Sequence, residues 1–325
     1  MMSHPDRDST PQVATGHELG LYYTLPYIMP QCNPFDCSKR TTKRGSGILA
    51  TDVKVRVISQ HSTRSLRNTL SEIWANRELL YFLVWKEIKI RYKQTAIGAT
   101  WAILQPLLTM LIFTAVFGMA LGIKTGNVPY PIFVYSGLLL WIYFSTSVNN
   151  ASSSIVANAQ LLSKVYFPRM LLPLSACLVG LLDFALASMI LIVMMFYFNI
   201  APTLWLLLIL LPLLLSMLLG AGLGFWLSAV SAKYRDVYYI VPFSIQLLLF
   251  ASPVIYPPSF IGADWSWVLT INPLAGIINF QRAIVLGTGI TDWAPLGISA
   301  LIVVLIFLGG MIYFSHYERE IADVI

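Results

Sequence analysis

Four basic side chains crowd one short segment just before a long apolar run, and the chemistry that such a group offers is anion binding. These four cations are Lys86, Lys89, Arg91 and Lys93. Guanidinium and ammonium groups form charge-assisted hydrogen bonds with carboxylates and phosphates. Trp85 lies beside them and brings an amphipathic ring of the kind that settles at membrane interfaces. The segment is therefore a candidate site for a lipid headgroup.

The aromatic and aliphatic residues of the same segment recur at helical spacing. They follow one another at intervals of four, three and four residues, which places them on one helix face: Tyr81, Trp85, Ile88 and Tyr92. A basic helix with such a face lies flat in the membrane interface. Two roles stay open for it, a topological anchor that docks on other helices and a basic collar for an anionic headgroup.

Asp183 is the one charged residue between Met170 and Ala232. A carboxylate at the bilayer centre costs about 2.5–3.5 kcal/mol on insertion scales, so it needs a partner or a function. We expect a structural or pore-facing role with a hydrogen bond to a neighbouring helix or subunit. A proton relay is the alternative.

Motifs for catalysis are absent from the sequence. It contains no GxxxxGK[ST] phosphate loop, no GxSxG nucleophile and no HExxH zinc motif. The three cysteines, Cys32, Cys37 and Cys177, have no metal-ligand spacing. We therefore expect no enzyme activity, no metal and no cofactor in this chain.

Composition indicates a membrane protein. Hydrophobic residues make up 57% of the 325 positions and charged residues 11%, whereas soluble domains carry about 25% charged residues. Nucleic-acid binding is a poor explanation for the net charge of +6. Residues 1–70 are polar, and we expect a disordered cytoplasmic tail there. Six apolar runs are long enough to span a bilayer, at 102–123, 132–151, 170–198, 204–231, 237–255 and 295–315.

The cations between these runs set the topology. The four cations precede the first run, Lys164 and Arg169 follow the second, and Lys233 and Arg235 follow the fourth. Because lysine and arginine gather on the cytoplasmic side, both termini are expected in the cytoplasm. The expected fold is an all-α membrane protein with six transmembrane helices, an N-terminal amphipathic interface helix and short re-entrant gate helices between spans five and six.

The apolar segment 256–292 is too interrupted by proline and glycine to form a further span. Backbone at membrane depth must be buried in protein or line a wet cavity, so this segment is a candidate gate on the outer face. The candidate gate residues are Tyr256, Pro257, Asn272, Pro273, Asn279 and Arg282. Aromatic side chains of the early spans could stack on sugar rings along a path, with membrane packing as the alternative. They are Trp101, Phe113, Phe117, Tyr135, Trp141, Tyr143 and Phe144.

Four stretches resemble one family, in its order and spacing. They are LVWKEIKIRYKQTAIGATWAILQPLLTMLIFTAVFG at 83–118, NAQLLSKVYFPRMLLPL at 158–174, SAKYRDVYYIVPFSIQLLLFASPVIYP at 231–257 and INPLAGIINFQRAIVLG at 271–287. Residues 71–325 resemble the transmembrane domain of ABC type-2 permeases that export lipid-linked polysaccharide, with O-antigen exporters nearest.

This resemblance implies a mechanism and partners. It implies a homodimer in the bacterial inner membrane that works with two copies of a separate ATPase, which binds ATP and Mg. It places a coupling helix for that ATPase in the second connection, with a plain cationic loop as the alternative: Lys164, Val165, Tyr166, Phe167, Pro168 and Arg169. The implied cargo is polysaccharide linked to undecaprenyl diphosphate. Capsule, teichoic acid and a small lipid or drug are the alternative cargoes on the same fold. A secondary transporter that uses Asp183 is a less favoured mechanism.

Overall fold

The computed structural model describes residues 66–93, 100–126, 128–165, 167–262, 266–289 and 293–324. Within these ranges the regular structure is helical and contains no strand, which confirms the all-α prediction. Helix α1 spans Leu66–Ala75 and α2 spans Arg77–Lys93. The last five residues of the predicted tail, 66–70, belong to α1. The remainder of the tail, 1–65, lies outside the described residues.

Five helical segments in the described part of the chain are long and apolar enough to cross a membrane. The first is α3 (Thr100–Phe113), which continues as the π-helix η1 (Thr114–Ala120). The second is α4 (Tyr130–Ala157) and the third is α6 (Leu171–Tyr197). The 3-10 helix η2 (Leu204–Ile209) leads into α7 (Leu210–Lys233), and the last is α11 (Ala294–Val324). These segments match five of the six predicted spans.

The run predicted as the fifth span forms a shorter helix. Helix α8 covers Val237–Ala251, 15 residues, which is about 22 Å at 1.5 Å per residue. The hydrocarbon core of a bilayer is about 30 Å thick. The helix ends at Ser252, whose backbone is extended at φ −104° and ψ 143°. This residue precedes Pro253, and the proline ring disfavours helical geometry in the residue before it.

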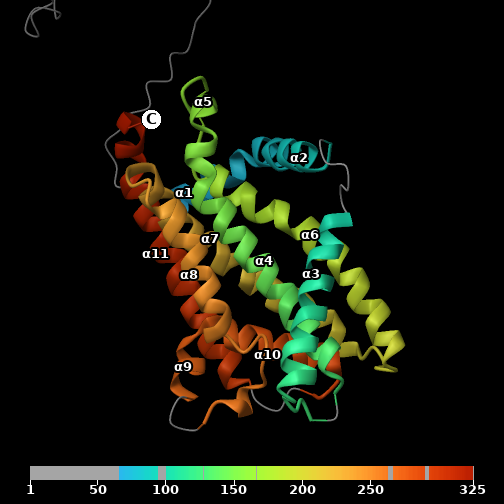
Figure 1. Cartoon of the computed structure of the whole chain (residues 1–325). Helices are drawn as coiled ribbons and strands as arrows, with labels where there is room; N and C mark the ends of the chain where they lie inside the picture. The colour runs from blue at the N-terminus through green and yellow to red at the C-terminus, as the bar shows by residue number, and fades with distance from the viewer. Residues whose placement is uncertain are drawn as a thin grey trace, which may run out of the picture. The chain divides into compact units, whose positions relative to one another are not determined.

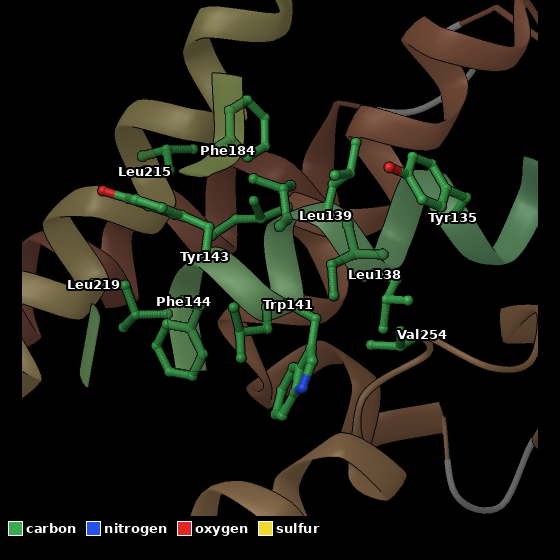
Figure 2. Packing of buried hydrophobic residues seen from close by; sticks show 14 of the residues in the cluster. Tyr135, Leu138, Leu139, Trp141, Tyr143, Phe144, Phe184, Leu215, Leu219 and Val254 are labelled. Atoms are coloured by element: carbon green, nitrogen blue, oxygen red, sulfur yellow. The ribbon is translucent and has the colours of Figure 1, made fainter. Parts of the chain in front are cut away.

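Helix α4 is the centre of the helix bundle. Its membrane-length window is 78% buried, against 11–39% for the other four candidate spans. It packs most extensively on α7 and α6, and α7 packs in turn on α11. Figure 1 shows α4 running through the middle of these helices, and Figure 2 shows its side chains pointing outward in several directions, with Phe144 beside Leu219. The position of α4 explains why so many of its aromatic residues are buried.

A small residue allows a close helix approach in this core. A Cβ atom on Gly224 of α7 would lie 2.6 Å from the Cβ of Ala151 on α4. That distance is shorter than real Cβ contacts, so only glycine permits the observed separation. Small residues at helix interfaces serve this purpose throughout membrane bundles. Gly224 therefore fixes a packing contact within one chain.

The bundle has two ends that carry different short helices. Helix α5 (Ala159–Leu162), α2 and the C-terminal end of α11 lie at one end in Figure 1. The 3-10 helix η3 (Pro258–Phe260), α9 (Ser266–Ile271) and α10 (Pro273–Leu286) follow α8, with α9 and α10 at the opposite end. We call these the α5 end and the α10 end. Short helices thus occur where re-entrant gate helices were predicted, while their role as a gate stays a prediction.

Candidate functional site

Helix α2 docks on the bundle through a leucine face. Leu83 is buried and packs against Phe167, which precedes α6, and against Leu171 and Leu172 at the start of that helix. Tyr81, by contrast, is exposed on the surface of the chain. The predicted amphipathic pattern is therefore not the docking pattern, because apolar side chains are spread around α2 and Trp85 and Ile90 are exposed as well. This spread suits a helix that meets protein on one side and lipid on another.

Polar contacts hold α2 at two further points along its length. Lys86 donates a hydrogen bond from Nζ to Oδ1 of Asn158, at the C-terminal end of α4, over 3.3 Å. Arg91 forms an ion pair with Asp183 of α6, with Nη1 2.5 Å from Oδ2. Tyr92 donates its hydroxyl hydrogen to the other carboxylate oxygen of Asp183. The lone acid of α6 is thus bound to the interface helix.

The ionisation of two groups on α2 responds to this environment. Burial raises the pKa of the Tyr92 phenol, and its hydrogen bond to Asp183 raises that pKa further. Tyr92 therefore stays a hydrogen-bond donor at physiological pH. Burial also raises the pKa of Glu87, although the neighbouring Lys86 and Arg91 act against that rise.

A cavity of about 570 Å³ lies under the end of α2. Its volume is in the range of small-molecule sites. Most of the wall is apolar and comes from α3, α4 and α6, including Phe184 and Leu139. The polar groups at its lining come from all four helices: Arg91, Tyr92, Gln105, Thr146, Asn150 and Asp183. An apolar chamber with an arginine in its wall is chemically suited to an amphipathic anion.

A second cavity, of about 370 Å³, has an almost wholly hydrocarbon lining. Its wall combines Phe144, Leu219 and Leu248 of the bundle with Trp267 of α9 and Pro273 of α10. No charged side chain contributes to its lining. This cavity can hold an apolar chain, but it offers no group that would select a headgroup.

Arg282 of α10 is buried and donates only to backbone carbonyls among the bonds seen in the described residues. Its Nη1 and Nη2 lie 2.5 Å from the carbonyl oxygens of Pro253 and Val254, and its Nε lies 3.2 Å from that of Phe133. The guanidinium also lies over the Phe133 ring, 3.8 Å from its centroid. Arg282 therefore ties α10 to α4 and to the turn after α8.

Two further contacts complete this fastening at the α10 end. Gln281 donates from Nε2 to the Ser136 carbonyl oxygen over 2.8 Å. Asn272 caps α10 by accepting a hydrogen bond from the Leu274 amide, and its own amide donates to Ser252 Oγ over 2.9 Å. These contacts hold the α9–α10 segment against the bundle.

Comparison with known proteins identifies the family. A family profile described as ABC-2 type transporter matches residues 78–286, which is more than half of the chain. The chain belongs to the ABC-2 type transporter family. An O-antigen export system permease protein RfbA from Myxococcus xanthus is 33% identical over 252 residues, covering 76% of this chain and 96% of that protein. An RfbA protein from Klebsiella pneumoniae is 28% identical over 249 residues, covering 76% and 95%.

A polysialic acid transport protein also matches this ABC-2 chain. The polysialic acid transport protein KpsM from Escherichia coli is 27% identical over 244 residues, covering 73% of this chain and 93% of that protein. The relatives are thus named as permeases or transport proteins of polysaccharides. The chain is accordingly a multi-pass membrane permease subunit of this family.

The structure separates the predicted headgroup residues of this ABC-2 permease into two groups. Lys86 and Arg91 are half-buried and bonded to the bundle, as described above. Lys89 and Lys93 are exposed, and so is Trp85. Lys89, Lys93 and Trp85 do not line the larger cavity. Of the four cations, Arg91 alone lines it.

The predicted coupling residues divide in the same way. Lys164 and Val165 are exposed at the α5 end, whereas Phe167 is buried against α2 and α6. Arg169, which follows the half-buried Pro168, donates from Nη1 to the Glu318 carbonyl oxygen of α11 over 2.9 Å. Tyr166 lies outside the described residues. Within this segment Lys164 and Val165 are therefore exposed, while Arg169 is hydrogen-bonded to α11.

Most of the predicted channel aromatics lie in the core. Tyr135, Trp141, Tyr143 and Phe144 are at most 5% exposed, because α4 is surrounded by other helices. The hydroxyl of Tyr135 donates to the Ala187 carbonyl oxygen over 2.9 Å. Tyr135 and Trp141 line neither cavity, while the Tyr143 ring lines the larger one and Phe144 the smaller one. The role of these four side chains along a glycan path stays a prediction. Phe113 and Phe117 are half-buried, and Trp101 is 54% exposed and lines that cavity.

Several of the predicted gate residues are hydrogen-bonded to the bundle and do not face an open channel in the described chain. Arg282 is 4% exposed, so its charge does not face a channel in the chain as described. Tyr256 donates its hydroxyl to the Phe250 carbonyl oxygen over 2.9 Å. Pro257, Asn272, Pro273 and Asn279 are half-buried.

Sequence reasoning missed an aromatic stripe on α8. Tyr239, Phe243 and Phe250 are 82%, 62% and 57% exposed and share one face of that helix, with Leu247 between them. Their spacing of four and seven residues was a signal that could have found them. Asn158, the partner of Lys86, carried no comparable signal, because a helix-end asparagine is common in any connection.

Proposed function

We propose that this chain is the membrane-spanning subunit of an ATP-driven exporter of polysaccharide linked to undecaprenyl diphosphate. The cargo, O-antigen or a related glycan, moves from the cytoplasm to the periplasm through a homodimer. Two copies of a separate ATPase subunit bind ATP and Mg and supply the energy. The observation that carries this proposal is the match to O-antigen export permeases over nearly the whole length of those relatives.

The larger cavity supports a site for the lipid diphosphate. It combines an apolar chamber, for the isoprenoid, with Arg91 at its wall, for the phosphates. The exposed aromatics of α2 would keep that helix at the lipid boundary, where a lipid-borne cargo arrives. We therefore assign the space between α2, α3, α4 and α6 to the first engagement of the headgroup.

The distribution of cations supports the direction of transport. By the positive-inside rule a cytoplasmic position of the α5 end is favoured by four cations, which are Lys164 and Arg169 at that end and Lys233 and Arg235 between α7 and α8. The exposed Lys164 and Val165 are then available to the ATPase. The α10 end, with its fastened α9–α10 segment, faces the periplasm and closes the path there.

The exposed stripe on α8 supplies a surface on which sugar rings can slide. Aromatic faces bind sugars with little positional register, which suits a repeating polymer. In a homodimer the stripe formed by Tyr239, Phe243 and Phe250 can face its counterpart across a shared path. This stripe replaces the buried α4 aromatics in our description of the glycan path.

Capsular polysaccharide is the second candidate cargo, because the polysialic acid transport protein also matches most of the chain. Proton-coupled transport through Asp183 has less support, since that carboxylate is paired with Arg91 and Tyr92. Deletion of the gene, with separate detection of surface and internal glycan, tests the proposal. We expect loss of surface polymer and accumulation of lipid-linked polymer inside. Unchanged surface glycan would overturn the proposal, and the identity of the retained polymer would decide between O-antigen and capsule.

A further inference from the structure

The ion pair between Arg91 and Asp183 lies in the wall of a cavity. The two side chains are 36% and 24% exposed, and both line the chamber of about 570 Å³. A ligand that enters this chamber therefore reaches Arg91 without any helix having to separate. It meets an arginine that already holds a carboxylate.

Asp183 presents to Arg91 the same kind of group as a lipid phosphate. The arginine guanidinium binds carboxylate and phosphate oxygens through the same N–H donors. The Tyr92 hydroxyl donates to the second oxygen of the carboxylate and thereby fixes its orientation. Because the acid is covalently part of the chain, it competes at a high effective concentration with every anion in solution or in the membrane.

The two charged side chains that line the chamber cancel in charge. Arg91 contributes one positive charge and Asp183 contributes one negative charge. A monoanionic phosphodiester can offer Arg91 no more charge than Asp183 already offers. A diphosphate carries more negative charge and more acceptor oxygens, so it can displace the carboxylate from both Arg91 and Tyr92.

We propose that Asp183 is a specificity-determining residue, which occupies Arg91 so that lipid diphosphates enter the site and ordinary monoanionic phospholipids do not. The proposal rests on the export function proposed above and concerns selection of its headgroup. Selection of this kind is needed because anionic phospholipids are abundant in the leaflet from which the cargo would come. Without an internal competitor, an arginine at the membrane surface would hold such lipids most of the time.

Native mass spectrometry of the full-length chain tests this selection. The purified protein is offered undecaprenyl diphosphate and palmitoyl-oleoyl phosphatidylglycerol together, and the bound amounts of each are compared. Binding that remains in Arg91→Gln is subtracted, so that only lipid held through Arg91 is counted. The readout is the ratio of bound diphosphate to bound phosphatidylglycerol, which a merely structural role of Asp183 would not move.

We expect Asp183→Asn to lower this ratio about fivefold through a gain of phosphatidylglycerol, the size of one partly exposed ion pair. Asp183→Glu, which keeps the charge, should retain most of the discrimination. Tyr92→Phe, which keeps both charges and loosens the carboxylate, should shift the ratio in the same direction by less. If Asp183→Asn does not fold, the ratio measured for Tyr92→Phe tests the selection instead.

An unchanged ratio in Asp183→Asn, or in Tyr92→Phe if that variant has to decide, overturns the selection. Binding of the diphosphate by the wild-type chain would still support the proposed function in that case. Absence of any Arg91-dependent binding of the diphosphate overturns the headgroup site itself and the selection with it. The two failures are thus distinguishable in one experiment.

Discussion

Replacement of Arg282 by methionine should loosen the α9–α10 segment from the bundle. Methionine fills a similar apolar volume but donates no hydrogen bond. The carbonyl oxygens of Pro253 and Val254 would each lose a donor that lies 2.5 Å away. An unpaired buried acceptor costs about 1–3 kcal/mol. The lost contact with the Phe133 ring adds about 2 kcal/mol, the value for a desolvated cation over an aromatic face.

The gross loss of roughly 4–8 kcal/mol is partly offset, because the variant no longer buries a guanidinium, which itself costs several kcal/mol. We therefore expect a net destabilisation of about 3 kcal/mol. For a chain of this size that lowers the apparent unfolding temperature by roughly 4–6 °C. Arg282→Lys should be destabilised as well, since one ammonium group cannot reach three carbonyls in the same fork.

Thermal unfolding of the detergent-solubilised protein, followed by size-exclusion chromatography with fluorescence detection, measures this shift. Arg235→Met is the matched control, because Arg235 is exposed and its removal should leave the unfolding temperature unchanged. An Arg282→Met variant as stable as the wild type would refute the view that this arginine fastens α10. Export by that variant should fall together with its stability.

Three further predictions concern packing, coupling and the headgroup site. Gly276→Ala should destabilise the α10–α11 contact by about 1–3 kcal/mol through overpacking, since its Cβ would lie 2.6 Å from the Pro295 carbonyl oxygen. Gly297→Ala on α11, where a Cβ meets nothing within 4 Å, is the control, and equal thermal stability of the two variants would contradict the packing argument. Arg169→Glu should uncouple ATP hydrolysis from export while the protein stays in the membrane, and normal export would discredit the coupling assignment. Glutamine at all four cations should weaken engagement of lipid-linked substrate, and unchanged export with correct topology would leave α2 as an anchor.

The positions of the spans could be predicted from the sequence because the bilayer sets a minimum length for apolar runs. Five of the six predicted runs became helices of spanning length. The exception, α8, shows what hydropathy does not register. The run continues to Ile255, but the pair Ser252 and Pro253 ends the helix four residues earlier.

The sequence could not show which apolar side chains point into the protein and which point outward, because lipid and the protein interior are equally apolar. Tyr135 and Phe243 are both aromatic residues in apolar runs, yet one is fully buried and the other is 62% exposed. Only the position of their helices, central for α4 and peripheral for α8, separates them. The partner of Asp183 was similarly out of reach, since Arg91 lies 92 residues earlier in the sequence. The sequence did predict that an acid in an apolar run needs a partner.

Reconstitution of the chain with its ATPase in proteoliposomes tests the export function most directly. Glycan linked to undecaprenyl diphosphate is placed in the outer leaflet, which corresponds to the cytoplasmic side for inside-out permeases, and its arrival in the lumen is measured by protection from an added glycosidase. We expect protection to grow only when both the ATPase and ATP are present. Protected glycan that accumulates without the ATPase, or no protection in the complete system, would contradict the account.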